Sequence, residues 1–277
     1  MKIRAGFRIA YECPQDTAML LVLNIHPSRR ADLLSEQVLS FDPPIEAQSY
    51  LDGFGNACSR IVAPRGVTTI STQFDIYDDG LPDPVPDHAS QHEIKDLPDE
   101  VLVYLLGSRY CDTDRMADFA WATFAATPLG WPRVKAILDF AHGHIAFDYQ
   151  KADALRSAFG GFTDRTGVCR DFAHLAITLC RCMNIPARYC TGYLGDIGVP
   201  PDTNPMDFSA WAEVYLGGRW HTIDARHNKP RIGRILMATG RDATDVALST
   251  AFGPAILKVF EVTTEELSTE NEATHQG

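Results

Sequence analysis

The sequence lacks the long apolar run of a membrane-spanning helix, because no stretch approaches about 20 consecutive apolar residues. Its first residues, MKIRAGFRIAYECPQ, alternate apolar and polar side chains like a strand and lack the continuous apolar segment of a signal peptide. Positive charge is scarce as well: 25 Lys and Arg against 36 Asp and Glu give a formal net charge of −11. These features predict a soluble cytoplasmic protein with no membrane and no nucleic acid as partner.

The cysteines do not form a disulfide framework. There are seven, an odd number, and they are scattered along a chain of 277 residues, which is typical of a reducing compartment. No Cys or His pair has zinc-finger spacing, and neither a phosphate-binding loop nor a dinucleotide fingerprint is present. The sequence therefore predicts neither a metal nor a cofactor.

What the chain does contain is enough apolar material for a core, with 45% hydrophobic and 10% aromatic residues. Residues 1–100 are expected to form an N-terminal β-rich, sandwich-like region that ends in an acidic, proline-rich connector over 78–100. The expected strands include 7–11, 19–25 and 67–76, with a hairpin turn at 52–56.

The pattern becomes helical after the connector. Apolar residues three and four apart predict helices over about 102–124, about 131–145, and from Cys169 to just before Pro186. Strands then follow at 187–194, 209–216 and 219–225. The expected class is α+β, with residues 101–265 as a core of helices packed on an antiparallel sheet and residues 266–277 as a flexible tail.

The stretch TGVCRDFAHL, residues 166–175, places Cys169 in the first turn of a helix. Free backbone N–H groups and the positive end of the helix dipole stabilise an anion there, which is one way to turn a thiol into a nucleophile. The alternative is that a small cysteine simply packs at the start of the helix.

The Gly-Gly pair at 217–218 predicts a two-residue hairpin loop. Counting back from that loop pairs Trp211 with Asp224 and Ser209 with Arg226. Ser209, Trp211 and Asp224 then share one face, with Ser209 diagonal to Asp224. Trp211 would wall a pocket on this face, and Asp207 would add a polar group near it.

The segments GVCRDFAHL and DFSAWAEVYLGGRWHTIDARHN resemble the bacterial transglutaminase-like superfamily, in its cysteine protease branch. The resemblance covers about residues 130–260 and implies a papain-like core with a Cys-His-Asp triad. It makes Cys169 the nucleophile and Asp224 the orienting acid. The family histidine immediately precedes Ala-Trp, and this chain has Ser209 there, whose hydroxyl is too weak a base to deprotonate a thiol.

Five other histidines are candidates for the base, of which His142 and His144 have no spacing tie to Cys169. His221 falls on the opposite face of its strand from Asp224, and His174 lies about 500° around the helix from Cys169. His227, three residues after Asp224, is the remaining candidate, since a turn there would bring its ring over the end of the hairpin. The alternative for His227 is a solvent-facing loop residue.

Two functions follow from these features. The first is a thiol-dependent amide or peptide hydrolase or acyl transferase, with a peptide or amide-containing substrate and a thioester on Cys169. The second is a catalytically degenerate relative that serves as a binding or scaffold module, with Ser209 as the mark of lost catalysis.

Overall fold

The computed structural model describes residues 1–202 and 204–267. Its N-terminal part contains strands β1 (Lys2–Cys13), β2 (Thr17–Leu21), β3 (Ser40–Asp42), β4 (Gln48–Leu51), β5 (Ala57–Ala63) and β6 (Gly66–Tyr77), with the short 3-10 helix η1 (Pro27–Asp32). The helical part contains η2 (Ile94–Asp96), α1 (Asp99–Leu102), η3 (Val103–Leu105), α2 (Thr113–Phe124), α3 (Trp131–His144), η4 (Tyr149–Lys151), α4 (Ala158–Asp164) and α5 (Cys169–Cys182). The remaining strands are β7 (Ala146–Phe147), β8 (Thr166–Gly167), β9 (Ala187–Leu194), β10 (Ser209–Leu216), β11 (Arg219–Ile223), β12 (Arg234–Gly240), β13 (Ser249–Ala251) and β14 (Ile256–Glu266).

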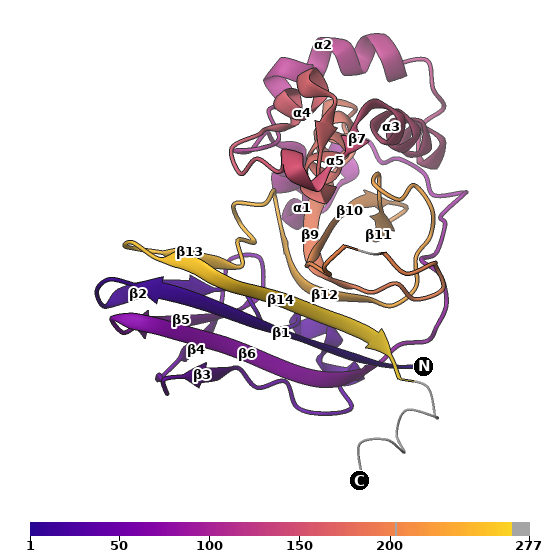
Figure 1. Ribbon diagram of the computed structural model, residues 1–277. Helices are drawn as coiled ribbons and strands as arrows, with labels where there is room; N and C mark the ends of the chain where they lie inside the picture. Colours follow the sequence, from indigo (N-terminus) through magenta and orange to yellow (C-terminus); the bar gives the residue numbers. More distant parts are fainter. Residues whose placement is uncertain (203, 268–277) are drawn as a thin grey trace.

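Two four-stranded antiparallel sheets form the lower part of the molecule in Figure 1, in the orders β14-β1-β6-β3 and β13-β2-β5-β4. Alternate side chains of β2, β5 and β6 face a common core, as a half-buried strand requires. That core includes Ile3, Ala5, Phe7, Ile9, Met19, Leu21 and Ile61. The predicted N-terminal β region is therefore confirmed as a pair of packed sheets, and the turn at 52–56 joins β4 to β5.

The last strands of the chain return to these sheets. β14 pairs with β1, and β13 pairs with β2. The sequence division at residues 100 and 265 does not anticipate this return, because pairing between strands some 250 residues apart leaves no local pattern. Most of the predicted tail, residues 268–277, lies outside the described residues.

A third antiparallel sheet, ordered β11-β10-β9-β12, carries the helices. Helix α5 packs on one face of this sheet, where Ala210, Ala212 and Val214 of β10 share a core with Leu175 and Leu179 of the helix. Tyr193, Ile235 and Met237 of the same sheet join the core of the N-terminal sheets instead. The third sheet thus connects the helical layer to the N-terminal sheets, and the predicted α+β class is confirmed.

The acidic, proline-rich segment 78–98 crosses from β6 to α1 with only η2 as regular structure. Most of its residues are exposed, as its composition predicts, but Asp83 is bonded to the third sheet. We call this segment the strap. Among the described residues, no helix combines the length and the apolar character that crossing a membrane requires.

Candidate active site around Cys169

Cys169 is the first residue of helix α5, directly after the short strand β8. The backbone before it is fixed by Asp171, whose Oδ2 accepts the N–H of Val168 at 2.8 Å and also an Arg156 guanidinium N–H at 3.3 Å. A side chain at Gly167 would place its Cβ 2.5 Å from that same Oδ2, so only glycine fits. The GVCRD sequence therefore builds a tight, well-held entry into the helix.

Cys169 differs from every other cysteine of the chain, because it alone is not buried. Desolvation by surrounding protein atoms nevertheless raises the pKa of its thiol, while the Arg226 guanidinium and a hydrogen bond from the backbone N–H of Ala210 act in the opposite direction. From its position at the start of a helix, Cys169 was expected to have a stabilised thiolate. In the free protein desolvation has the larger effect on the thiol pKa and favours the protonated thiol. A proton acceptor is therefore needed to generate the thiolate at neutral pH.

Asp224 and His227 form a hydrogen-bonded pair. Asp224 comes directly after β11, and the turn that follows brings His227 back over it. The Nδ1 atom of His227 lies 2.8 Å from Oδ2 of Asp224, and the His227 backbone N–H donates to Oδ1 at 3.0 Å. A carboxylate that accepts the N–H three residues onward makes the bond that an Asp at a helix N-cap makes, so Asp-Ala-Arg-His spacing is itself compatible with this arrangement.

The carboxylate of Asp224 is buried but strongly held in its ionised form. Burial raises the pKa of Asp224, but the hydrogen bond from His227 and the charge of Arg234 together lower it well below its ordinary range. Because an ionised carboxylate only accepts hydrogen bonds, Nδ1 of His227 must be the donor. The other nitrogen of the ring, Nε2, is then the one that can accept a proton.

Arg234 and Trp211 support this pair from behind. Arg234 Nη2 donates to Oδ2 of Asp224 at 2.7 Å, and its guanidinium lies 5.1 Å from the centre of the Trp211 ring. The sequence did not identify Arg234 as the partner of this carboxylate. Trp211 does share a face with Asp224, but it lines neither pocket at Cys169, so its predicted place in the pocket wall was wrong.

Ser209 is the first residue of β10, and its Oγ is buried with no hydrogen-bond partner among the described residues. The hairpin register is as predicted from Leu216–Arg219 to Ala212–Ile223, and both loop glycines, Gly217 and Gly218, have positive φ. The register ends there, because the chain turns away at Asp224. The extrapolated pairs Trp211–Asp224 and Ser209–Arg226 therefore do not form, and Ser209 pairs with Gly192 of β9 instead.

Two pockets meet at Cys169, and Asp207 and Ser209 line both of them. The smaller, of about 120 Å³, also includes Arg226 and His227. The larger, of about 730 Å³, runs past the other side of Cys169 and has mostly apolar walls. The structure thus brings Cys169, Ser209, Asp207 and His227 to one cavity, with Asp224 behind His227.

The other histidines weighed as the base have structural partners. His174 is fully buried, and its ring lies 5.1 Å from that of Tyr110 and 5.0 Å from that of Tyr189. His221 bonds the Leu216 carbonyl through Nε2 and is buried rather than half-exposed. His142, which has no spacing tie to Cys169 in the sequence, bonds the Ala225 carbonyl through Nδ1 at 3.1 Å and so stabilises the turn that carries His227.

Comparisons with known proteins identify a family and a similar fold. A family model described as the transglutaminase-like superfamily matches residues 119–225, a range that includes Cys169, Ser209 and Asp224 but ends before His227. The crystal structure of a candidate cysteine protease from Cytophaga hutchinsonii is 30% identical, with a TM-score of 0.82, and the match covers 97% of this chain and 91% of that one.

Mycobacterial proteins are similar too. An uncharacterised protein of Mycobacterium leprae is 34% identical over 119 residues, which span 42% of this chain and only 39% of that relative. One of Mycobacterium bovis is 27% identical over 233 residues, or 75% of this chain and 73% of its own length.

Proposed function

Because the chain belongs to the transglutaminase-like superfamily, we propose that it is a thiol-dependent amide or peptide hydrolase or acyl transferase. In this proposal Cys169 is the nucleophile, His227 is the general base in place of the missing family histidine, and Asp224 orients His227. The hydrogen bond between His227 Nδ1 and Asp224 Oδ2, in a pocket shared with Cys169, is the observation that carries the proposal. A nucleophile, a base and a third group that orients the base are the parts that such chemistry needs.

The first half of the reaction forms a thioester. Nε2 of His227 takes the thiol proton of Cys169, and the sulfur attacks the carbonyl carbon of the bound amide. The carbonyl oxygen becomes an oxyanion, which accepts hydrogen bonds from backbone N–H groups at the start of α5, including that of Cys169. The tetrahedral intermediate then collapses, the C–N bond breaks, and the departing amine takes the proton back from His227.

The second half releases the acyl group. His227 removes a proton from water, or from an incoming amine, as that molecule attacks the thioester carbonyl. The C–S bond breaks, and the sulfur of Cys169 recovers a proton from His227. Asp224 remains ionised throughout and stabilises the imidazolium that forms twice in the cycle.

The alternative role as a binding or scaffold module rests on one observation, the serine at position 209. Its buried hydroxyl has no hydrogen-bond partner among the described residues, and the base that the resemblance leads us to expect at this position is absent. The two functions differ in a simple respect: the enzyme depends on the sulfur of Cys169, whereas a scaffold tolerates its replacement.

A mixed peptide substrate tests the proposal. The protein is incubated with a library of peptides with and without glutamine, in the presence and in the absence of a fluorescent primary amine. Products are identified by mass spectrometry. Cleavage or deamidation without amine indicates hydrolysis, and amine incorporation indicates transfer. Both must disappear in Cys169→Ala and persist in Cys58→Ala, which removes a buried cysteine of the N-terminal sheets. Equal product from wild type and Cys169→Ala would refute the thiol mechanism.

A further inference from the structure

Arg234, which holds Asp224, is itself held twice by the N-terminal part of the chain. Oδ2 of Asp83, in the strap, accepts the Nε–H of Arg234 at 2.8 Å. Nη1 of Arg29, in η1, donates to the backbone carbonyl of Arg234 at 2.7 Å. The side chain of Arg234 is thus held by a residue about 150 positions earlier in the sequence, and its main chain by a residue 205 positions earlier.

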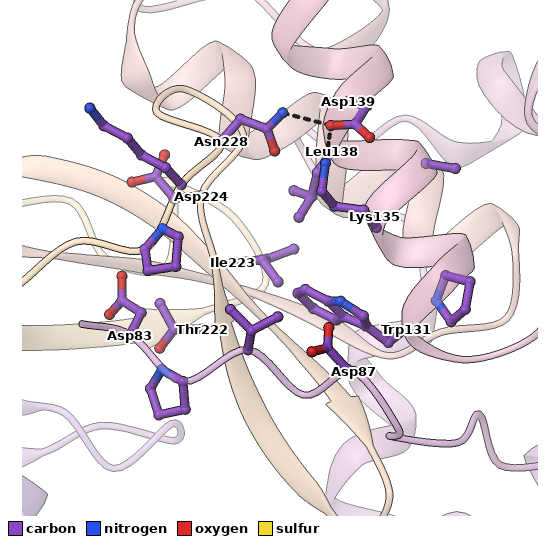
Figure 2. A pocket seen from close by; sticks show the side chains of 16 residues that line it. Asp83, Asp87, Trp131, Lys135, Leu138, Asp139, Thr222, Ile223, Asp224 and Asn228 are labelled. Atoms are coloured by element: carbon purple, nitrogen blue, oxygen red, sulfur yellow. Dashed lines mark hydrogen bonds and ion pairs between the residues drawn. The ribbon is translucent and has the colours of Figure 1, made fainter. Parts of the chain in front are cut away.

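The strap is locked in place at Asp83. Its backbone N–H donates to the Arg231 carbonyl at 2.9 Å, and its Oδ2 accepts the Arg231 N–H, also at 2.9 Å. Figure 2 shows a further pocket, lined by Asp83 of the strap, Asp224 and Thr222, in which Asp83 lies beside Thr222 of β11 and on the same side as Asp224. This residue is the point where an otherwise exposed segment is bonded to the back of the candidate site.

The guanidinium of Arg234 bridges two carboxylates in a buried setting. Its side chain is 7% exposed, that of Asp224 is 4% and that of Asp83 is 17%. Because guanidinium is planar, bonding Nε to Asp83 and Nη2 to Asp224 fixes the orientation of the whole group. Loss of one carboxylate frees this plane to rotate and leaves a buried cation with half of its partners.

We infer that Asp83 is a positioning residue of the active site: it aligns Arg234, which aligns the Asp224 carboxylate with which His227 is bonded. The inference rests on the proposed function, in which His227 is the base. It also gives the strap and the N-terminal sheets a role in the reaction, since they supply the outermost member of a chain that runs Asp83, Arg234, Asp224, His227. Asp83 lines neither pocket at Cys169, so it acts on turnover rather than on substrate contact.

Asp87 provides a matched control on the same strap. It is an exposed aspartate with no hydrogen bond or ion pair to any residue that the structure describes. Asp83→Ala and Asp87→Ala therefore remove the same charge and the same atoms from one segment, but only the first removes a bond to Arg234. Asp83→Asn keeps an acceptor oxygen and serves if the alanine variant does not fold.

The readout that does not depend on activity is the proton NMR resonance of the His227 Nδ1–H, assigned by its absence in His227→Gln. We expect it downfield in wild type and in Asp87→Ala, broadened or lost in Asp83→Ala, and intermediate in Asp83→Asn. In turnover assays, Asp83→Ala should lower kcat about ten- to a hundredfold, as misplacement of a catalytic group does, and leave KM within about twofold.

The outcomes separate the two claims. An intact resonance and unchanged kcat in Asp83→Ala, alongside Asp87→Ala, would overturn the positioning role, as would a resonance missing from wild type. If instead Cys169→Ala shows that the proposed function is wrong, the resonance alone still decides whether Asp83 aligns His227.

Discussion

The two sides of the candidate site differ in the hydrogen bonding of the groups nearest the proposed base and the proposed nucleophile. On the base side, both oxygens of Asp224 are occupied, Oδ1 by the His227 backbone and Oδ2 by His227 and Arg234. On the nucleophile side, Ser209 Oγ is buried with no partner among the described residues, and desolvation raises the pKa of the Cys169 thiol. In the proposed mechanism the base is therefore pre-organised before substrate arrives, whereas the nucleophile side holds groups that a substrate can engage.

The largest effect on turnover and stability is expected from the substitution Asp224→Asn, on the base side of the site. The amide would place its NH2 either against the Arg234 guanidinium and the His227 Nδ1–H, at the position of Oδ2, or against the His227 backbone N–H, at the position of Oδ1. Each of these groups is a donor, so the amide holds the imidazole less well than the carboxylate does. We expect turnover to fall about 10³- to 10⁴-fold. A buried pair that loses one partner also costs about 3–5 kcal/mol in the free energy of unfolding. Steady-state kinetics and urea unfolding measure the two effects.

Asp245→Asn is the control for that experiment. Asp245 forms an ion pair with Arg241, with Oδ2 2.9 Å from Nε; this pair is more exposed than that of Asp224, and Asp245 lines neither pocket at Cys169. It should lose stability and keep its turnover within about twofold. Equal loss of turnover in both variants would mean that Asp224 acts only through the fold.

A smaller effect is expected when a histidine is placed at position 209, on the nucleophile side of the site. In wild type, Ser209→His should add no activity, because neither oxygen of Asp224 is free to orient a second imidazole. In a His227→Ala background the same substitution meets a partly vacated carboxylate, and we expect it to restore activity about tenfold over His227→Ala alone. Rescue is measured as kcat/KM of the double variant relative to the single one, and a gain in the wild-type background would contradict the occupied-carboxylate argument.

The smallest expected effect is on the pH dependence of stability, through a buried histidine beside the larger pocket. His174 lies under Tyr110 and Tyr189 of the larger pocket, and burial lowers the pKa of its imidazole. Below about pH 6.5 the unfolded chain binds a proton that folded His174 does not. The free energy of unfolding should therefore fall with decreasing pH, by up to about 1.4 kcal/mol per unit for this group.

Urea unfolding between pH 7 and pH 5 measures how the free energy of unfolding changes with pH, in wild type and in His174→Gln. His174→Gln should flatten it, and His88→Gln, at an exposed position of the strap, should leave it unchanged. Parallel slopes for wild type and His174→Gln would show that other groups set the pH dependence.

Local patterns predict much of this molecule. The helix that begins at Cys169 follows from a glycine turn before an amphipathic run, and the hairpin follows from Gly217 and Gly218. Alternation correctly puts Trp211 and Asp224 on one face, where Arg234 contacts both. Alternation gives no information on which face of the sheet the sulfur of Cys169 approaches. For that reason the expectation that Trp211 lines the pocket at Cys169 was wrong.

Long-range pairings were not predictable in the same way. The bond between Asp83 and Arg234 joins residues 151 positions apart, and nothing near either residue announces it. The end of β11 at Ile223 was also missed, although the turn residues after Asp224 signal it, because the strand register was extended beyond its last bonded pair. His227, in contrast, is fixed by a three-residue spacing, and that spacing is visible in the sequence.

The central claim is that His227 is the base for Cys169, and the pH dependence of Cys169 alkylation tests it most directly. Iodoacetamide is applied across pH 5–10 to wild type, His227→Ala and the control His88→Ala, and the labelled peptide is quantified by mass spectrometry. The account predicts that wild type and His88→Ala react at lower pH than His227→Ala, whose desolvated thiol ionises only above the usual value of about 8.5. Superimposable profiles for wild type and His227→Ala would contradict it.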